Sequence, residues 1–568
     1  MDRKTKQTVI GISVVVSLIL LVAAFLWIKA MTPSKEVMTL DEYYHTEDGK
    51  VTLIMQDYIY EKQGLLIDGH VYIDYDTVVS EFNSRFYWDS NENILTYTTP
   101  TELIRTEVGS NDYTINKSKE SFGYQIVKTN GGEEVYIALE FVAKYSDMKY
   151  QMFEAPDRVV FTYRYGEFLY TKTKKATQVR FEPSIKSKIL EQVTSGTKLM
   201  LVDTEEETHK KFKKVITEDG VIGYVQNSAV ESPEYEKLES DFNAPVYTHI
   251  KKDKAINLVW HQVTNQEANN YMPSLLENTK GITVISPTWI TLADDKGGIT
   301  SIASQTYVDR AHEKGLEVWA LVDDFTGTGK ISKVLSRTST RERLINVIVA
   351  EVIKYNIDGI NIDFEKIKKD FAKDYIQFLR ELSIKCRSNG IVLSIDNYVP
   401  ASYNKFYDRK EQGIIADYII VMGYDEHHGS SEESGSVSSM PFFKDGILNT
   451  LEEVPAERVI MAMPFFTRVW METTKDGETK VTSEARSMDS AWTYMTQNGA
   501  EPVFDEATGQ YYAEFKKDDV VYKCWLEEET SIESRMKLVN ENKLAGVAGW
   551  RLGLEKSNIW NVIIKYVN

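Results

Sequence analysis

Cysteine is almost absent from this chain. Its 568 residues contain only Cys386 and Cys524, so a fold held together by a disulfide framework is excluded. The sequence alone leaves open whether these two residues form a single bridge. No Cys/His cluster has the spacing of a zinc site, and we interpret the adjacent pair His427 and His428 as a solvated loop segment.

Positive charge is also scarce. The chain has 66 Lys and Arg residues against 85 Asp and Glu residues, which gives a formal net charge of −19 and a pI of about 5.1. Phosphate binding requires clustered Lys and Arg, so this balance argues against a nucleic-acid partner. The hydrophobic share of 42% and the charged share of 27% are those of a globular protein. The length suggests three or four domains.

The first 35 residues have the pattern of a membrane anchor. Arg3, Lys4 and Lys6 precede an uncharged run of 21 residues, 8–28, which is long enough to cross a bilayer as a helix. A cleaved signal peptide is the alternative, but it would have a shorter apolar run and a small-residue cleavage site. The basic flank predicts that residues 1–7 stay in the cytoplasm and that the rest of the chain lies outside the cell membrane. Residues 29–35 then form a short stalk.

Two small, mostly-β domains are predicted next. Residues 36–175 contain runs rich in β-branched and aromatic residues, such as Val51–Met55 and Arg158–Tyr163. The stretch from Val71 to Thr98 weakly resembles the amino-terminal domain of copper amine oxidases, without any copper chemistry. Residues 176–231 resemble a bacterial Src-homology-type-three barrel. Binding to the cell wall and simple spacing are equally compatible with this module.

From about residue 250 the sequence alternates between strand and helix patterns, which predicts parallel strands with helical crossovers. Eight strands over about 315 residues fit a (β/α)₈ barrel, hence an α/β fold class. We expect a helix from Arg341 to Tyr355 that begins with a capping box of Ser339 and Glu342. Residues 471–528 are predicted to be a small α+β insertion. The expected strands are Ala255–His261, Gly281–Ser286, Leu316–Val322, Ile357–Glu365, Ile391–Asp396, Tyr418–Tyr424, Arg458–Met463 and Gly546–Trp550.

The segment Asp358–Glu365, with the sequence DGINIDFE, is the most informative stretch of the chain. Asn361, Asp363 and Glu365 alternate with Ile360, Ile362 and Phe364, so the polar side chains share one face of a strand. Carboxyl groups crowded at a strand end shift one another's pKa values, as acid–base catalysis requires. An exposed edge strand is the alternative, but the apolar helix before it favours a buried one.

Other polar and aromatic residues follow the neighbouring strands. Asp396–Tyr398 ends the fifth strand and Met422–Asp425 the sixth, while Trp550 ends the eighth and Trp289 follows the second. Active sites of such barrels form at the carboxyl ends of the strands. Acids among aromatic rings suit a sugar, because the rings stack on its apolar faces and an acid protonates the glycosidic oxygen.

These motifs resemble glycoside hydrolase family 18. The resemblance rests on Asp358-Gly-x-Asn361-x-Asp363-x-Glu365, on Met422-x-Tyr424-Asp425 and on the late Trp550, and it covers about residues 250–568. Within the family the likeness is to the branch of bacterial spore-cortex-lytic N-acetylglucosaminidases. The segments Ser286–Trp289, Val318–Leu321, Tyr522–Trp525 and Gly546–Trp550 resemble that branch.

The resemblance implies a retaining mechanism in which the 2-acetamido group of the substrate is the nucleophile. Glu365 is then the general acid, Asp363 holds the acetamido N–H, and Tyr424 donates to the acetamido carbonyl. Asn361 and Asp358 are expected to support them. No cofactor and no metal are implied. The expected substrate-binding residues are Trp550, Asp425, Met422, Trp289, Arg468 and Trp470.

Asn361 departs from the family pattern, because many members have Asp at this position. An Asp can share a proton with the following Asp, whereas Asn can only form hydrogen bonds. We therefore expect Asp363 to ionise more simply and the pH profile to differ. In addition, Asp323–Asp324 replaces the small-residue motif that many chitinases carry on the third strand.

The leading hypothesis is a membrane-anchored extracellular glycosidase that cleaves β-1,4 N-acetylglucosaminyl bonds in peptidoglycan. A chitinase or chitooligosaccharide hydrolase is the alternative enzyme. A barrel that binds wall polysaccharide or chitin without cleaving it is an alternative of another class. The presence of Glu365 disfavours this last reading.

Overall fold

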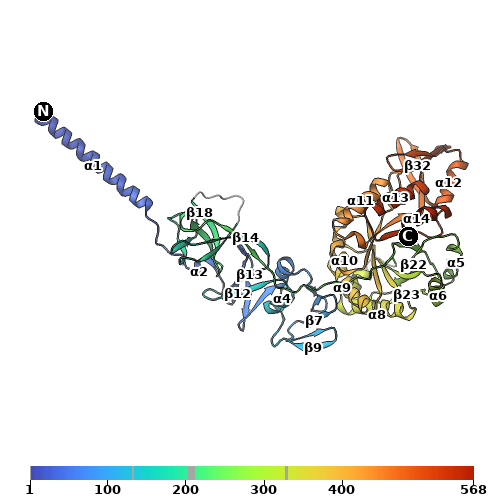
Figure 1. The fold of residues 1–568 in the computed structure, drawn as a ribbon, viewed down its shortest axis with the longest axis horizontal. Coiled ribbons are helices and arrows are strands. Elements are labelled where there is room, and N and C mark those ends of the chain that lie inside the picture. The colour runs from blue at the N-terminus through green and yellow to red at the C-terminus, as the bar shows by residue number, and fades with distance from the viewer. Residues whose placement is uncertain (1, 131–133, 203–210, 326–329, 568) are drawn as a thin grey trace. The chain divides into compact units, whose positions relative to one another are not determined.

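The computed structural model describes residues 2–130, 134–202, 211–325 and 330–567, and these residues divide into two compact units. The first unit comprises residues 1–86, 108–112 and 121–244. The second comprises residues 87–107, 113–120 and 245–568. The second unit therefore combines the predicted barrel with a piece of chain from far earlier in the sequence (Figure 1).

The first unit begins with helix α1, Arg3–Met31, none of whose residues is buried. Its 29 residues make it long enough to cross a membrane, and its composition is apolar enough. Two antiparallel-rich sheets follow. One runs β10-β11-β4-β3-β1-β13-β12, with β2 beside β1, and the other runs β16-β15-β19-β18-β17-β14-β20. The strands expected at Val51–Met55 and Arg158–Tyr163 are present as β1 and β13.

The elements of the first unit have the following bounds: α2 Leu40–Tyr44, β1 Lys50–Met55, β2 Tyr58–Ile59, β3 Gly64–Ile67, β4 His70–Asp74, α3 Tyr75–Thr77, η1 Val78–Phe82, β10 Val127–Asn130, β11 Glu134–Ala138, α4 Leu139–Tyr145, β12 Lys149–Phe153, β13 Arg158–Thr162, β14 Gly166–Lys172, β15 Thr177–Arg180, β16 Ile189–Val193, β17 Lys198–Leu201, β18 Phe212–Ile216, β19 Ile222–Gln226, η2 Asn227–Ala229 and β20 Glu234–Leu238.

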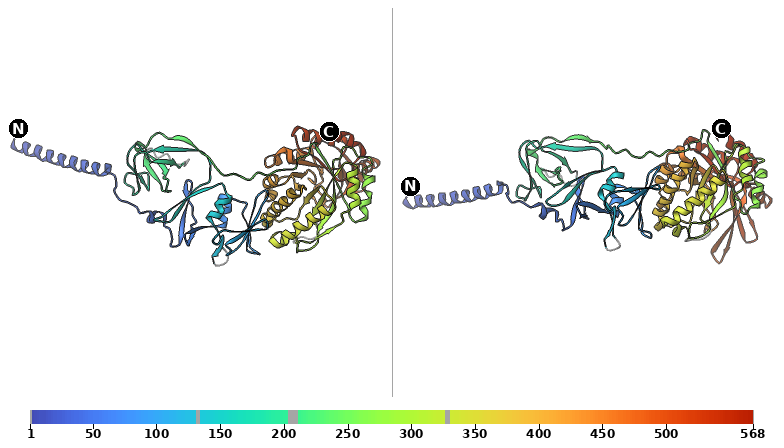
Figure 2. Two further views of the ribbon diagram at one scale, coloured as in Figure 1. Left: turned by 60° about the horizontal axis from the view of Figure 1, so that its bottom comes forward. Right: turned by 90° about the horizontal axis from the view of Figure 1, so that it is seen from below.

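The second unit is built on a closed barrel of parallel strands, and all eight predicted strands are confirmed. The order is β21-β22-β24-β25-β26-β27-β28-β34, and the barrel closes because β21 pairs with both β22 and β34. Helices surround the strands in every view (Figures 1 and 2). The bounds are β21 Ile256–His261, β22 Val284–Leu292, β24 Glu317–Asp323, β25 Gly359–Asp363, β26 Val392–Tyr398, β27 Tyr418–Met422, β28 Val459–Pro464 and β34 Gly546–Trp550.

The other elements of this unit are η3 Glu267–Tyr271, α5 Met272–Leu275, β23 Ile299–Ser301, α6 Gln305–Glu313, α7 Lys330–Leu335, α8 Thr338–Lys354, η4 Lys369–Phe371, α9 Ala372–Asn389, η5 Ser402–Tyr407, α10 Arg409–Ile415, α11 Met440–Leu451, η6 Ala456–Arg458, α13 Glu529–Glu541, η7 Ser557–Ile559 and α14 Trp560–Val567. Strand β23 pairs antiparallel with β22.

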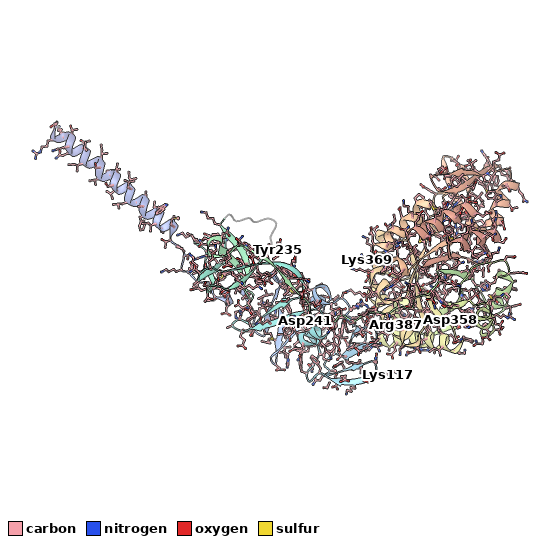
Figure 3. All side chains as sticks on the ribbon, viewed as in Figure 1. Lys117, Tyr235, Asp241, Asp358, Lys369 and Arg387 are labelled. Atoms are coloured by element: carbon pink, nitrogen blue, oxygen red, sulfur yellow. The ribbon has the colours of Figure 1, made fainter. Side chains whose placement is uncertain are left out.

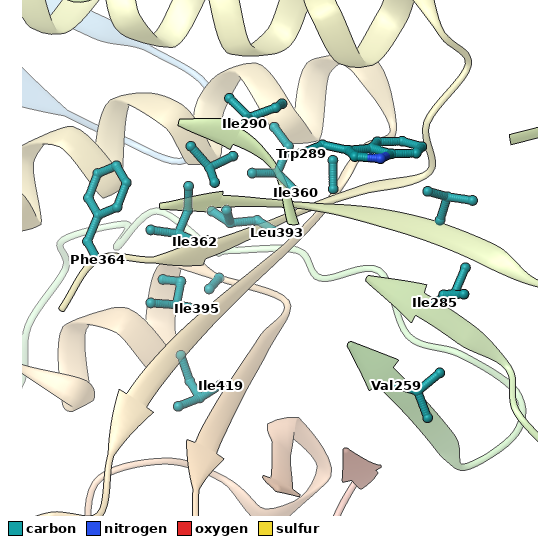
Figure 4. Close-up of a cluster of buried hydrophobic side chains, with 14 of the residues drawn as sticks. Val259, Ile285, Trp289, Ile290, Ile360, Ile362, Phe364, Leu393, Ile395 and Ile419 are labelled. Atoms are coloured by element: carbon teal, nitrogen blue, oxygen red, sulfur yellow. The ribbon is translucent and has the colours of Figure 1, made fainter. Parts of the chain in front are cut away.

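Strand β25 separates its apolar and polar residues as its alternation predicts. Ile360, Ile362 and Phe364 pack in the hydrophobic cluster between the strands and the surrounding helices (Figure 4). Asn361 and Asp363 therefore point to the barrel interior, because successive strand side chains face opposite sides. The strand is shorter than expected, and Glu365 lies just beyond its carboxyl end.

The insertion before the last strand is confirmed as an α+β domain. It has the strand order β30-β29-β33-β32-β31 and one helix, α12 (Figure 1). It starts somewhat earlier than predicted, because β29 begins at Phe466. The bounds are β29 Phe466–Lys475, β30 Glu478–Ser487, α12 Met488–Gln497, β31 Val503–Asp505, β32 Gln510–Lys517 and β33 Val520–Leu526.

A short meander from the amino-terminal half belongs to the barrel unit. It consists of β5 Tyr87–Asp89, β6 Ile94–Thr98, β7 Leu103–Glu107, β8 Asp112–Ile115 and β9 Ser118–Ser121. Arg341 of α8 is fully buried, with its guanidinium 4.7 Å from the ring centre of Tyr87 and its Nε 3.0 Å from Glu381 of α9. The meander thus packs on the two helices that flank β25 in sequence.

The start of helix α8 differs from the prediction. The expected capping box is wrong. The N-cap residue of the helix is Arg337, whose side chain makes no capping hydrogen bond, and Glu342 forms an ion pair with Arg105 of β7. Asp89 accepts hydrogen bonds from the backbone N–H and hydroxyl of Thr338. Carboxylates stabilise the positive end of a helix, so the cap comes from the meander.

Candidate active site

A cavity of about 720 Å³ opens among the residues at the carboxyl ends of the barrel strands. Most of the residues singled out in the sequence contribute to its wall. They are Trp289, Asp363, Glu365, Met422, Tyr424, Asp425 and Trp550. Carboxyl groups and aromatic rings therefore face the same space.

Glu365 is held in the cavity from two directions. Both oxygens of the Asp324 carboxylate accept backbone N–H groups, that of Glu365 at 3.0 Å and that of Lys366 at 2.9 Å. The Tyr398 hydroxyl donates to the Glu365 carboxylate. Burial raises the pKa of Glu365, and the hydrogen bond from Tyr398 and the charge of Lys366 lower it in part. A carboxyl group with a raised pKa stays protonated further toward neutral pH, as a general acid requires.

Asp363 is one of the nearly buried acids of the cavity, as is Asp396. Asp363 is 5% exposed, and its Oδ1 atom is buried without a hydrogen-bond partner. Burial raises its pKa well above the usual value, and the neighbouring carboxyls of Asp396 and Glu365 raise it further. The expectation that Asp363 ionises more simply was wrong, because it considered only position 361 and not the carboxyl of Asp396 on the next strand.

Asn361 is fully buried below these acids and uses both ends of its amide. Its Oδ1 accepts from the Trp260 indole N–H at 2.9 Å and from the Ser286 hydroxyl at 3.2 Å. Its Nδ2 donates to Ser394 at 3.1 Å and to Asp396 at 2.7 Å. Through the barrel interior, Asn361 therefore links β25 to β21, β22 and the adjacent β26, and it donates a hydrogen bond to Asp396.

Aromatic residues also contribute to the cavity wall. Trp550 is half-buried at the end of β34, and its ring centre lies 5.7 Å from that of the buried Trp260. Tyr424 follows β27 and is also half-buried, with its ring 6.3 Å from that of Phe466. Burial and the nearby acids, led by Asp396, raise the pKa of Tyr424 well above its usual value. Its hydroxyl thus stays protonated and can donate a hydrogen bond.

Two predicted site residues lie elsewhere. Asp358 precedes β25, five residues and about 16 Å of extended strand before Asp363, and it is labelled in Figure 3. Its carboxylate accepts the Val318 N–H at 2.8 Å and lies 2.7 Å from His312 Nε2, so it joins elements at the other end of the barrel. Trp470 is 1% exposed on β29, and its indole donates to the Gly435 carbonyl. It is absent from the cavity wall.

Two further predicted site residues, Trp289 and Arg468, belong to the site only in part. Trp289 borders the cavity but is 2% exposed, with its indole N–H bonded to Asn269 and its ring packed on Tyr307. Its main contacts are therefore those of a core residue. Arg468 is half-buried, bonds Ser483 and lies close enough to Asp425 to lower the pKa of that carboxyl in part. It supports the cavity from outside.

Four residues at the site had been given no role from the sequence: Trp260, Asp324, Asp396 and Tyr398. Asp324, Asp396 and Tyr398 stand at or just after strand ends, which was a usable signal once a barrel was assumed. Trp260 gave no such signal. Its role depends on a hydrogen bond to a residue 101 positions later in the chain.

Comparison with known proteins identifies the family. Residues 258–555 match the glycosyl hydrolases family 18. The chain belongs to this family. Residues 175–231 match the bacterial SH3 domain, and residues 53–160 match the copper amine oxidase N-terminal domain. As a family 18 protein, the chain is a glycosidase, and it is similar to cortical fragment-lytic enzymes and to chitinases.

The relatives of this family 18 chain include bacterial glycosylases and cortical fragment-lytic enzymes. It is 29% identical to an uncharacterized glycosylase of Bacillus subtilis over 294 residues, covering 48% of this chain and 82% of the other. It is 25% identical to the cortical fragment-lytic enzyme of the same organism, covering 41% and 56%. The chain thus spans about half the length of that enzyme. A putative chitinase domain from Desulfitobacterium hafniense has the same fold, with a TM-score of 0.50 at 21% identity, covering 55% and 98%.

Proposed function

We propose that this protein is a membrane-anchored, extracellular glycosidase that cleaves β-1,4 N-acetylglucosaminyl bonds of peptidoglycan with retention of configuration. The observation that carries the proposal is the grouping of Glu365, Asp363 and Tyr424 opposite Trp550 around one cavity. The relationship to cortical fragment-lytic enzymes supports a wall substrate.

In the proposed reaction, Glu365 gives its proton to the glycosidic oxygen while the bond from that oxygen to C1 breaks. The acetamido carbonyl oxygen of the substrate forms a new bond to C1 and gives an oxazolinium ion. Asp363 accepts the acetamido N–H and faces the positive charge, and Tyr424 donates to the acetamido oxygen. Because the nucleophile belongs to the substrate, no second carboxylate has to attack C1, unlike in the usual scheme with two carboxylates.

The second half of the reaction uses the same groups. A water molecule attacks C1 from the side that the leaving group vacated, and its proton passes to the Glu365 carboxylate. The bond between C1 and the acetamido oxygen breaks, so the acetamido group and the protonated Glu365 are restored. Trp550 stacks beneath the reacting sugar, and Met422 and Asp425 border it. Two displacements at C1 restore its original configuration.

The anchor supports action at the cell wall. Helix α1 is about 43 Å long at 1.5 Å per residue, and a bilayer core is about 30 Å thick. Basic residues at its start favour an amino terminus inside the cell. An enzyme held in this way reaches the adjacent wall more readily than dispersed chitin. The bacterial SH3 domain lies between the anchor and the barrel in sequence, and we propose that it binds or spaces the enzyme at the wall.

Parallel digests test this function. The chain from residue 36 onward is incubated with purified peptidoglycan and with chitin oligomers, and the new reducing ends are identified. We expect N-acetylglucosamine at the new ends of peptidoglycan, and Glu365→Gln should release none above background. Faster cleavage of chitin oligomers would favour the chitinase alternative, and no new ends from either substrate would refute the proposal.

A further inference from the structure

Asp363 lies between two other carboxyl groups on neighbouring strands. Strand β25 pairs with β24 so that Asp363 is opposite Asp323. Strand β25 also pairs with β26, where Asn361 lies opposite Ser394. Two residues further along both strands, Asp396 lies at the level of Asp363. All of these side chains point to the barrel interior, because residues two apart on a strand share a face. The strand register therefore sets three carboxyls in one row.

The surroundings of Asp363 and Asp396 contain acids and phenols. Asp363 is faced by Asp323, Asp324, Glu365 and Asp396, and the Tyr424 hydroxyl lies near both. Among the described residues, no lysine or arginine forms an ion pair with either carboxyl. Asp363 and Asp396 are 5% and 4% exposed. Two adjacent buried carboxyls without a cation cannot both be ionised at moderate cost.

The orientation of Asn361 is settled by its neighbours. The indole N–H of Trp260 can only donate, so the atom that it reaches at 2.9 Å must be the amide oxygen. The amide nitrogen then faces Ser394 and Asp396. Asn361 can thus give an N–H to Asp396 but can neither take nor hold a proton.

Asp323 and Asp396, the carboxyl groups on the strands beside Asp363, differ in the hydrogen bonds that they accept. Asp323 accepts the Phe325 N–H at 3.1 Å on one oxygen and the Thr291 hydroxyl at 3.0 Å on the other. Donors on both oxygens favour the ionised form of a carboxyl. Asp396 accepts only the Asn361 amide among the described hydrogen bonds, on Oδ1. Asp396 is therefore the better partner for the buried and unpartnered Oδ1 of Asp363.

We propose that Asp363 and Asp396 hold one proton between them. Asp396 on β26 then supplies the second carboxyl group, which β25 lacks because Asn361 stands where many family members have Asp. The pair then carries a single negative charge. Burial raises the pKa of Asp396, in agreement with a retained proton, while the Asn361 hydrogen bond opposes this in part. Asp396 is a positioning residue, since it acts through Asp363.

The consequence for catalysis rests on the proposed function. When the acetamido N–H reaches Asp363, the bond between the shared proton and Asp363 breaks and the proton is held by Asp396. The negative charge is then on Asp363, where the oxazolinium ion forms. No proton leaves the pair. Asn361 keeps Asp396 at a fixed place for this transfer.

Infrared spectroscopy of the full-length chain in detergent tests the shared proton without any substrate. The measurement is made on the Glu365→Gln variant, at a pH about two units above the pKa of about 6 of Asp324. Residue 365 and Asp324 then contribute little to the protonated-carboxyl band. We expect a protonated-carboxyl band that disappears both in Asp396→Asn and in Asp363→Asn, because the remaining acid of the pair ionises in each. The matched control is Asp323→Asn, which keeps the band. A band that persists in Asp363→Asn or Asp396→Asn, or that is lost in Asp323→Asn, would overturn the inference.

Kinetics give a second readout. Asp396→Asn in the otherwise native enzyme should lower kcat about a hundredfold, as for a misplaced catalytic group, and change KM less than about threefold, because Asp396 acts when charge develops. Unchanged kcat would count against the inference. The two proposals fail separately. A native chain that cleaves neither substrate would refute the proposed function and leave the infrared result intact.

Discussion

Asp89, at the end of strand β5, accepts hydrogen bonds from the backbone N–H and the hydroxyl of Thr338, at 2.5 and 2.6 Å. The two residues are 249 positions apart. Glu92 accepts the N–H of Ser339 in the same way, at 2.8 Å. Helix α8 leads into the strand of Asp363, and carboxylates of the meander therefore cap its N-terminus.

Removal of this cap should loosen the start of α8. Asp89→Ala is expected to cost about 1–2 kcal/mol locally, the usual value of an N-cap, which corresponds to about tenfold faster hydrogen exchange at the amides of Thr338 and Ser339. Mass spectrometry of peptic peptides measures the change. The exposed Asp48 provides the matched control as Asp48→Ala. Equal exchange in both variants would show that the meander does not cap the helix.

Arg105 should stabilise the barrel unit in a pH-dependent way. Burial favours a raised pKa for Glu381, but Arg341 and Arg105 outweigh it and hold the pKa below its usual value. A carboxyl with a depressed pKa contributes stability above its unfolded pKa and loses it as pH falls through the folded pKa. Arg105→Met should therefore cost about 1–3 kcal/mol near neutral pH and progressively less in acid. Thermal unfolding at several pH values, with Lys117→Met as an exposed control on the same meander, tests this.

Tyr398 should tune the pKa of Glu365, the proposed general acid. Its hydroxyl donates to Glu365 and lowers the pKa of that carboxyl relative to burial alone. Tyr398→Phe removes this effect, so the pKa rises and Glu365 stays protonated to higher pH. The alkaline limb of kcat/KM should then move to higher pH, and a series of rates on one oligosaccharide measures it. Tyr403→Phe, at a side chain 76% exposed, should leave the limb in place; a shift to lower pH in Tyr398→Phe would contradict the assignment.

Asp358 should be dispensable for the chemistry despite its place in the family motif. Asp358→Asn is expected to keep kcat within about threefold and to lose about 1–3 kcal/mol of stability, because its contacts are with Val318 and His312. Asp363→Asn provides the contrast, with a stable fold and activity reduced at least about a hundredfold. Comparable loss of kcat in both variants would assign Asp358 to the reaction.

Two of the three predicted tryptophans, Trp550 and Trp470, should differ in the same manner. Trp550→Ala removes a ring from the cavity wall and should lower kcat/KM about ten- to a hundredfold, equivalent to about 1.5–3 kcal/mol of apolar burial. Trp470→Phe removes a buried indole hydrogen bond and should lower the melting temperature while leaving KM within about threefold. A large change of KM in Trp470→Phe would bring that residue back to the substrate site.

Much of the barrel was accessible from local patterns. The strands of the barrel are short apolar runs separated by helical stretches, and each local pattern carries its own period. The polar face that Asn361 and Asp363 share on β25 followed from their alternation with Ile360, Ile362 and Phe364. Helix α8 was also predicted within a few residues, because its apolar stripe is local.

The sequence by itself therefore determined the family 18 barrel, the acidic strand end and the apolar first helix, since each depends on neighbouring residues. The tertiary structure decided which groups meet. Tyr398 reaches Glu365 across 33 residues, Asn361 reaches Asp396 across 35, and Asp89 reaches Thr338 across 249. Such pairs depend on strand register and on the packing of distant elements. A one-residue slip in register would turn Asp396 to the other face of its strand, and no local pattern of residues specifies that choice.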